Sequence, residues 1–318
     1  MDKDSFRKGV EASLKSLDTE EPIDIYFYRP LGYRCALGFA RWGVHPNVVT
    51  ITSIVIGVAS GVFFYFDAWW LNLVGILLLV WANVYDSTDG QLARMTGKKT
   101  LWGRLLDGFA GDLWFFSIYF FICLRFTMSH DWESERWQIL SVWLMAAFAG
   151  FICHSRQCSL ADYYRNVHLY FLKGKEGSEL DTFKQQRALF HATPWKHHFW
   201  WKLWLYFYGN YTRLQESMTP EFQRLMSLVR ERYGDDVPDS FRNRFRELSK
   251  PLMVYANILT FNTRSIALFI LLLAGMPWCY FVFEITVMNV LFFYMRYRHE
   301  KFSSMLYAQL SKEGEANG

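Results

Sequence analysis

The chain has 318 residues, of which 52% are hydrophobic and 19% aromatic, and its formal net charge is +4. This composition is too apolar for an ordinary soluble enzyme, while the 20% of charged residues excludes a chain that lies wholly in a membrane. The five cysteines have neither paired nor metal-ligand spacing, so we expect free thiols rather than disulfides or a zinc site.

The N-terminal segment is the first predicted element. Residues 1–25 are charged and lack the apolar stretch of a signal peptide, so we expect them to stay cytoplasmic. Residues 31–42 mix apolar side chains with arginines, as an interfacial helix does. The dipeptide Pro46-Asn47 follows, and both residue types commonly open helices.

Six hydrophobic stretches are long enough to cross a hydrocarbon core of about 30 Å at about 1.5 Å per residue. The last two are short and separated only by Gly275-Met-Pro277, which predicts a helical hairpin with the proline at its turn. The predicted spans lie near 48–66, 70–92, 103–124, 138–158, 261–276 and 279–296.

The distribution of basic residues predicts the orientation. With a cytoplasmic N-terminus, the outer connections are 67–69, 125–137 and 276–278, and of all lysines and arginines these hold only Arg125 and Arg136. Cytoplasmic loops carry the excess of such residues, so we expect both termini and the inner ends of the spans to be cytoplasmic.

Residues 159–257 interrupt the spans with a long polar segment, which we interpret as a cytoplasmic helical insert. Helical patterns lie near 180–191, 197–216, 219–233 and 238–250. The aromatic and basic stretch 195–204 fits either the headgroup region or packing within the insert. The predicted domains are 1–45, 46–158 with the first four spans, 159–257, 258–298 with the last two spans, and a tail at 299–318.

A group of acids lies at the cytoplasmic ends of the second and third spans. Positions three apart share a helix face, so Asp86 and Asp89 point the same way, and Asp107 begins the answering face on the next span. Carboxylates at membrane depth are costly and indicate a functional site. Such an oxygen-rich group suits Mg²⁺ or Mn²⁺, and a pair of ions would neutralise a pyrophosphate.

The residues around these acids resemble a family signature. The segment Asp86-Ser-Thr-Asp89-Gly90-Gln-Leu-Ala93-Arg94, followed after eight residues by Gly103-Arg-Leu-Leu-Asp107, resembles the D-x2-D-G-x2-A-R and G-x3-D-x3-D pattern of the CDP-alcohol phosphotransferase (CDP-alcohol phosphatidyltransferase) family. The segment from Pro46 to Thr50 is similar to the helix start that precedes this signature in the family.

The resemblance implies a reaction and a set of roles. An acceptor hydroxyl attacks the β-phosphorus of a CDP-linked substrate and releases CMP. The first three acids and a fourth hold two metal ions, and the fourth is also the general base. The nucleotide lies against Gly90 and Ala93, and Arg94 reaches one of its phosphates. The implied nucleotide-binding residues are Asp86, Asp89, Gly90, Ala93, Arg94 and Gly103.

The fourth acid departs from the family spacing. It would fall at Gly111, whereas this chain has its carboxylate at Asp112. In a regular helix position 111 lies about 40° from Asp107, and Asp112 about 140°. A π-bulge, eased by Gly108 and Gly111, would return Asp112 to the site as metal ligand and general base. Otherwise a water, Asp107 or another residue takes the proton.

The sequence leaves the identity of both substrates open. Arg156 and Arg264 fit a substrate phosphate, with interfacial anchors or structural ion-pair partners as the equal alternative. Either a CDP-lipid donates to a soluble alcohol, or a soluble CDP-alcohol donates to a lipid hydroxyl. An inositol or inositol phosphate head group is favoured. The alternative is an ethanolamine or choline type enzyme with a diacylglycerol or ceramide-like acceptor.

Two further functions compete with the transferase. Buried acids also mark cation transporters and channels, and Gly111 is compatible with a catalytically degenerate partner. We expect a homodimeric integral protein of the bacterial inner membrane with a cytoplasmic site and no nucleic-acid partner.

Overall fold

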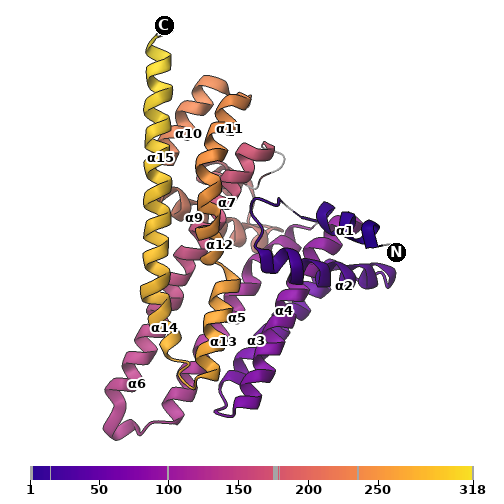
Figure 1. Cartoon of the computed structure of the whole chain (residues 1–318), viewed down its shortest axis with the longest axis vertical. Coiled ribbons are helices and arrows are strands. Elements are labelled where there is room, and N and C mark those ends of the chain that lie inside the picture. Colours follow the sequence, from indigo (N-terminus) through magenta and orange to yellow (C-terminus); the bar gives the residue numbers. More distant parts are fainter. Residues whose placement is uncertain are drawn as a thin grey trace. The chain divides into compact units, whose positions relative to one another are not determined.

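The structure is a computed structural model and describes residues 3–14, 16–98, 100–174, 178, 180–234 and 236–316. Within these ranges the secondary structure is helical and contains no strand, as Figure 1 shows. The predicted all-α fold class is therefore confirmed.

Six of the helical stretches are long and apolar enough to cross a membrane, as the sequence predicted. The last three of them continue far beyond the predicted limits into polar sequence. The stretches are Pro46–Phe64, Trp69–Thr96, Leu106–Met128, Trp132–Lys173, Asp239–Leu273 and Cys279–Glu313.

The helices form two compact units. The first contains the chain up to Ser155 together with Phe261–Val287, and the second contains Arg156–Thr260 and the chain from Met288 onward. That residues 159–257 form a separate cytoplasmic insert stays a prediction. Helices of the first unit are α1 (Lys3–Ala12), η1 (Asp24–Tyr28), α2 (Arg29–Arg41), α3 (Pro46–Phe64), α4 (Trp69–Thr96), α5 (Leu101–Met128), α6 (Trp132–Ala147), η2 (Phe148–His154), α13 (Phe261–Leu273), α14 (Cys279–Phe283) and the start of η5 (Glu284–Met288).

In the first unit, glycines allow α3 to pack closely on α5. A Cβ on Gly57 would lie 2.2 Å from the Trp114 ring, and one on Gly61 would lie 2.4 Å from Ser117 Oγ. The Ser117 hydroxyl donates to the carbonyl oxygen of Val58 at 2.8 Å. Small residues at helix contacts are typical of membrane proteins. Figure 1 shows α3, α4 and α5 side by side.

The N-terminal segment packs against the helix that carries the acids. Arg29 forms an ion pair with Glu20 at 2.9 Å, and its carbonyl oxygen accepts a hydrogen bond from the Gln91 side chain at 3.2 Å. The α2 helix appears where an interfacial helix was predicted, although its depth in a membrane stays a prediction. Thus residues before Pro46 support the position of α4.

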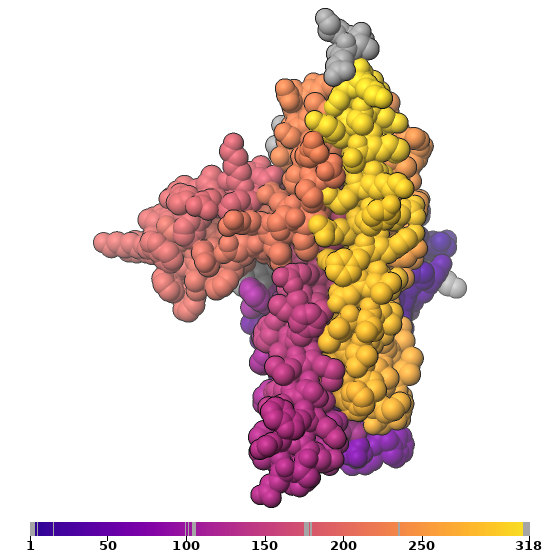
Figure 2. Space-filling model, turned by 90° about the vertical axis from the view of Figure 1, so that its left-hand side faces the viewer, coloured from indigo at the N-terminus to yellow at the C-terminus, as the bar shows by residue number. Residues whose placement is uncertain are grey.

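The second unit confirms the helical patterns predicted between 180 and 250. Thr182 opens α8 with a reciprocal capping box to Gln185, as Thr and Gln do at helix starts. Figure 2 shows α15 in yellow lying against α10 in orange. The unit contains α7 (Ser155–Lys173) from Arg156 onward, α8 (Phe183–Ala192), α9 (Phe199–Ser217), α10 (Pro220–Tyr233), α11 (Asp239–Ser249), η4 (Lys250–Leu252), α12 (Met253–Ile258) and α15 (Asn289–Ala316).

Candidate metal centre

Three carboxylates from two neighbouring helices meet in the first unit. Asp86 and Asp89 lie one turn apart on α4, and Asp107 lies on α5. One oxygen from each lies within 4.8 Å of the others. Asp89 is 4% exposed, Asp86 is half-buried and Asp107 is exposed. The structure thus brings together the three acids that the sequence placed on facing helix surfaces.

These acids suit a hard divalent cation. Carboxylates this close repel one another unless a cation or protons neutralise them. The Oδ2 atom of Asp89 is buried and has no hydrogen-bond partner among the described residues. A buried acceptor of this kind needs a ligand, and Mg²⁺ or Mn²⁺ takes carboxylate oxygens together with substrate phosphates. The residues present therefore fit the implied metal.

Arg94 folds back over Gly90 on the same helix. A Cβ on Gly90 would lie 3.4 Å from Arg94 Nη1 and 3.6 Å from Nη2. The Nε atom of Arg94 is buried and has no hydrogen-bond partner within the described part of the chain. A guanidinium beside an acidic cluster has donors left for a phosphate. The nucleotide-binding role of Gly90, Ala93 and Arg94 stays a prediction, which this geometry favours.

Gly103 lies in a tight contact between two helix starts. A Cβ there would lie 2.7 Å from Asn47 Oδ1 and 3.0 Å from Thr100 Oγ1. The Thr100 hydroxyl donates to Asn47 Oδ1 at 3.1 Å and accepts from the Gly103 N–H at 2.9 Å. This contact ties the start of α5 to the start of α3, so packing alone requires a glycine here. Its nucleotide-binding role stays a prediction.

Asp112 lies apart from the three acids. The predicted π-bulge is wrong, because α5 is a regular α-helix from Leu101 to Met128. Asp107 and Asp112 are therefore about 140° apart around the helix axis. Asp112 is not a member of the close carboxylate group and instead lines a pocket with His154. Its role as fourth metal ligand and general base has no support from this geometry and stays a prediction.

Arg264 forms a fully buried ion pair with Glu284 in the first unit. Both side chains are 0% exposed, and the Arg264 guanidinium also lies 3.0 Å from His154 Nδ1. The Tyr280 hydroxyl donates to Glu284 Oε1 at 2.5 Å. This surrounding matches the structural ion-pair alternative for Arg264 rather than a substrate phosphate. Arg156 is exposed at the start of the second unit, and its phosphate role stays a prediction.

The sequence interpretation missed Glu284. The signal was present, because this acid stands alone in the apolar sixth span and Arg264 opens the fifth. Ionisable residues within spans face the protein interior and pair with one another. A search for one acid and one base in neighbouring spans would have found the pair.

The comparisons with known proteins agree with this site. Residues 43–174 match the model of the CDP-alcohol phosphatidyltransferase family, and this stretch contains all the signature positions on α4 and α5. Neither the curated proteins nor the solved structures that were searched gave a match. Six apolar helices fit the membrane setting of such a transferase. By this match and by its acidic centre, the segment 43–174 is similar to the CDP-alcohol phosphatidyltransferase family.

Proposed function

We propose that this protein transfers a substituted phosphate from a CDP-linked donor to a hydroxyl acceptor, with release of CMP. The acceptor oxygen forms a bond to the β-phosphorus, the bond between that phosphorus and the oxygen shared with CMP breaks, and the hydroxyl proton leaves to a base. The observation that carries the proposal is the group Asp86, Asp89 and Asp107, with carboxylate oxygens within 4.8 Å of one another.

The three acids would hold the metal ions, of which we propose two. When bound, Mg²⁺ or Mn²⁺ neutralises the pyrophosphate and stabilises the charge that develops on the leaving CMP. Asp86 and Asp89 fix the donor against α4, and Arg94 offers its forked donors to a phosphate oxygen. Positioning and charge neutralisation account for most of the catalysis in such transfers.

One of the two substrates is proposed to be a lipid, since the chain has six apolar helices. The product is then a phosphodiester lipid. An inositol or inositol phosphate head group is one candidate, and an ethanolamine or choline head group on a diacylglycerol or ceramide-like acceptor is the other. We also propose a homodimer in the bacterial inner membrane with a cytoplasmic site.

The test is CMP release by purified protein in lipid nanodiscs. CDP-diacylglycerol with inositol or inositol phosphate forms one arm, and CDP-choline or CDP-ethanolamine with diacylglycerol or ceramide forms the other, each with and without Mg²⁺ or Mn²⁺. We expect metal-dependent CMP release in one arm only.

The matched variants are Asp107→Asn and Asp131→Asn. Asp107→Asn removes a charge from the centre and should lower the rate by at least about 100-fold. Asp131 caps α6 away from the centre, and asparagine caps equally well, so Asp131→Asn should keep the rate. Equal rates for both variants, or no CMP release in any arm, would reject the proposal and favour a degenerate partner.

A further inference from the structure

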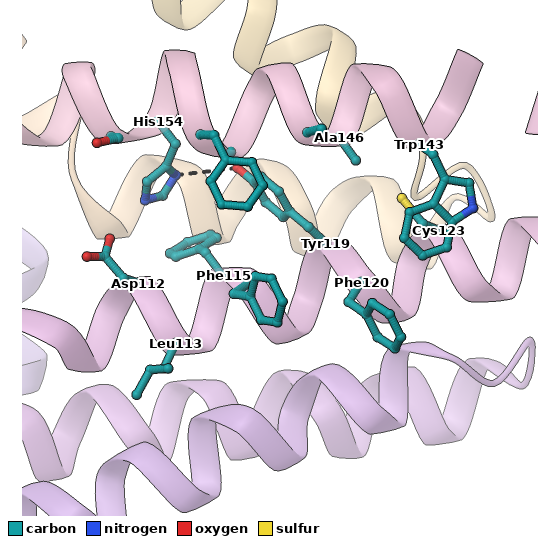
Figure 3. Close-up of a pocket in the computed structure, with 14 residues that line it drawn as sticks. Asp112, Leu113, Phe115, Tyr119, Phe120, Cys123, Trp143, Ala146 and His154 are labelled. Carbon is teal, nitrogen blue, oxygen red and sulfur yellow. Dashed lines mark hydrogen bonds between the residues drawn. The ribbon is translucent and has the colours of Figure 1, made fainter. Parts of the chain in front are cut away.

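A pocket of about 420 Å³ lies in the first unit, between α5, α6 and η2 (Figure 3). Its walls are largely aromatic and aliphatic, and none of its lining residues is a lysine or arginine. Such a size is typical of sites for small organic ligands. The pocket therefore suits an apolar molecule without a phosphate.

The pocket is polar at one end only. Asp112 and His154 lie at the same end, and Cys123 and Trp143 lie at the other (Figure 3). Along α5 the distance from Asp112 to Cys123 is about 16 Å, since each helical residue adds about 1.5 Å. This length and the polarity at one end match a hydrocarbon chain with one polar end.

The partners of His154 determine what the polar end can bind. A guanidinium only donates hydrogen bonds, so the His154 Nδ1 atom, 3.0 Å from Arg264 Nη1, must accept. This leaves the ring proton on Nε2, which becomes a donor. The Asp112 carboxylate is an acceptor. One donor and one acceptor together match a hydroxyl group, which can accept from the first and donate to the second.

One wall of the pocket has π-helical rather than α-helical backbone. His154 ends η2, a π-helical segment (Phe148–His154) that also contributes Gly150 and Phe151 to the lining. Short π-helical segments within α-helices are frequent at functional sites. This π-helix was not predicted, and it lies on the wall of the pocket that contains His154.

Two glycines leave the surface of α5 bare between the metal centre and the pocket. Around the helix, Gly111 lies about 40° and Gly108 about 100° from Asp107, inside the 140° that separates Asp107 from Asp112. A Cβ at either glycine would meet no described heavy atom within 4 Å. Along the axis the two acids differ by only about 7.5 Å. A polar group can therefore pass over bare backbone from Asp112 to Asp107.

We propose that this pocket binds the hydrocarbon chain of a neutral, hydroxyl-bearing lipid, represented by diacylglycerol, with its hydroxyl held between Asp112 and His154. The hydroxyl can then move along the bare backbone at Gly108 and Gly111 to the metal centre. The inference rests on the proposed function and identifies the lipid as the hydroxyl acceptor of that reaction.

Photo-crosslinking of the full chain in phosphatidylcholine nanodiscs tests the site without requiring turnover. The probe is a diacylglycerol with a diazirine in one acyl chain, and labelled peptides are identified by mass spectrometry. We expect labelling of α5 and of α6 with η2. Ala147→Phe should reduce it at least about tenfold, because the ring fills an exposed part of the lining and excludes several methylene groups. Leu144→Phe, at an exposed position of α6 outside the lining, is the matched control and should label normally.

The hydroxyl is tested with Asp112→Asn and an O-acetylated probe. Asp112→Asn should weaken capture of the free hydroxyl by about 3- to 10-fold and leave capture of the acetylated probe unchanged. A merely structural role would lower both equally. This variant also replaces Ala147→Phe if the latter does not fold.

The outcomes separate this inference from the proposed function. CMP release without labelling of these helices, or equal labelling of the two phenylalanine variants, would overturn the pocket assignment while the transferase stands. Pocket labelling that depends on Ala147 and Asp112 but without CMP release in any arm would support the site and reject the transferase.

Discussion

Two carboxylates five residues apart on one helix have different surroundings. Asp107 faces Asp86 and Asp89, whereas Asp112 lines the apolar pocket with His154. The difference follows from the regular geometry of α5, which turns the two side chains about 140° apart. At Gly111, where the family signature has its fourth acid, this chain has bare backbone.

The metal requirement should therefore distinguish the two acids. Asp107→Asn should raise the Mg²⁺ or Mn²⁺ concentration for half-maximal CMP release by at least about tenfold, because a ligand charge is lost. Asp112→Asn should leave this concentration unchanged and raise the KM for the lipid. The measurement is a metal titration of each variant at saturating nucleotide. A shifted metal midpoint for Asp112→Asn would instead make Asp112 the fourth ligand.

The buried ion pair leads to a stability prediction. Glu284→Ala leaves the Arg264 charge buried without its carboxylate, which should cost about 3 to 5 kcal/mol of unfolding free energy. The comparison is Glu11→Ala, which breaks the exposed pair of Arg7 and Glu11, and should cost at most about 0.5 kcal/mol. Denaturant unfolding in one detergent measures both. Equal losses of unfolding free energy in the two variants would show that the buried ion pair stabilises the fold no more than the exposed one.

At the scale of helices, local sequence signals predicted where helices begin but not which helices contact one another. Pro46, Thr182 and Pro220 each stand at or just before an observed helix start, because capping and proline chemistry act within a few residues. By contrast, α1 (Lys3–Ala12) was not predicted, and the contact of Gly57 with Trp114 joins residues far apart in the sequence. Such contacts depend on tertiary packing, which a single sequence does not reveal.

The α3–α5 contact predicts a strong effect of a single methyl group. In Gly61→Ala the new Cβ would lie 2.8 Å from the Ser117 carbonyl carbon and 2.9 Å from the Ile118 nitrogen, so backbone must move. We expect a loss of about 1 to 3 kcal/mol.

Gly38→Ala is the matched control for this variant. Gly38 is helical and has no described heavy atom within 4 Å of its Cβ position. This change should be neutral or stabilise by up to about 1 kcal/mol. Thermal unfolding of both variants in the same detergent provides the comparison, and similar melting temperatures would contradict the close contact.

At the scale of the whole molecule, hydrophobicity and one signature were enough for the fold class and the acidic centre. The six spans follow from the length and hydropathy of their stretches, and the centre follows from the acids placed on α4 and α5. What remained hidden was the polar network of Glu284 and His154, since its members come from helices distant in sequence. The same holds for the pocket, because its lining combines two separate spans.

The membrane orientation of the whole chain can be tested on the three short loops that the helix bounds now define. Residues 65–68, 129–131 and 274–278 contain no lysine or arginine, whereas the loop after α4 contains Lys98 and Lys99. Because basic loops stay cytoplasmic, we expect the first three loops on the outer face and Lys98 inside.

Cysteine labelling measures this orientation. All five native cysteines are free, so their replacement breaks no disulfide. In that background, Ser129→Cys and Met276→Cys place thiols at exposed positions of two outer loops, and Lys98→Cys places one at the exposed inner loop. An impermeant maleimide should label the first two in intact spheroplasts and the third only after permeabilisation. Labelling of Lys98→Cys in intact spheroplasts would reverse the orientation, and because the acids lie at the same end of α4 as Lys98, it would also move the proposed site to the outer face.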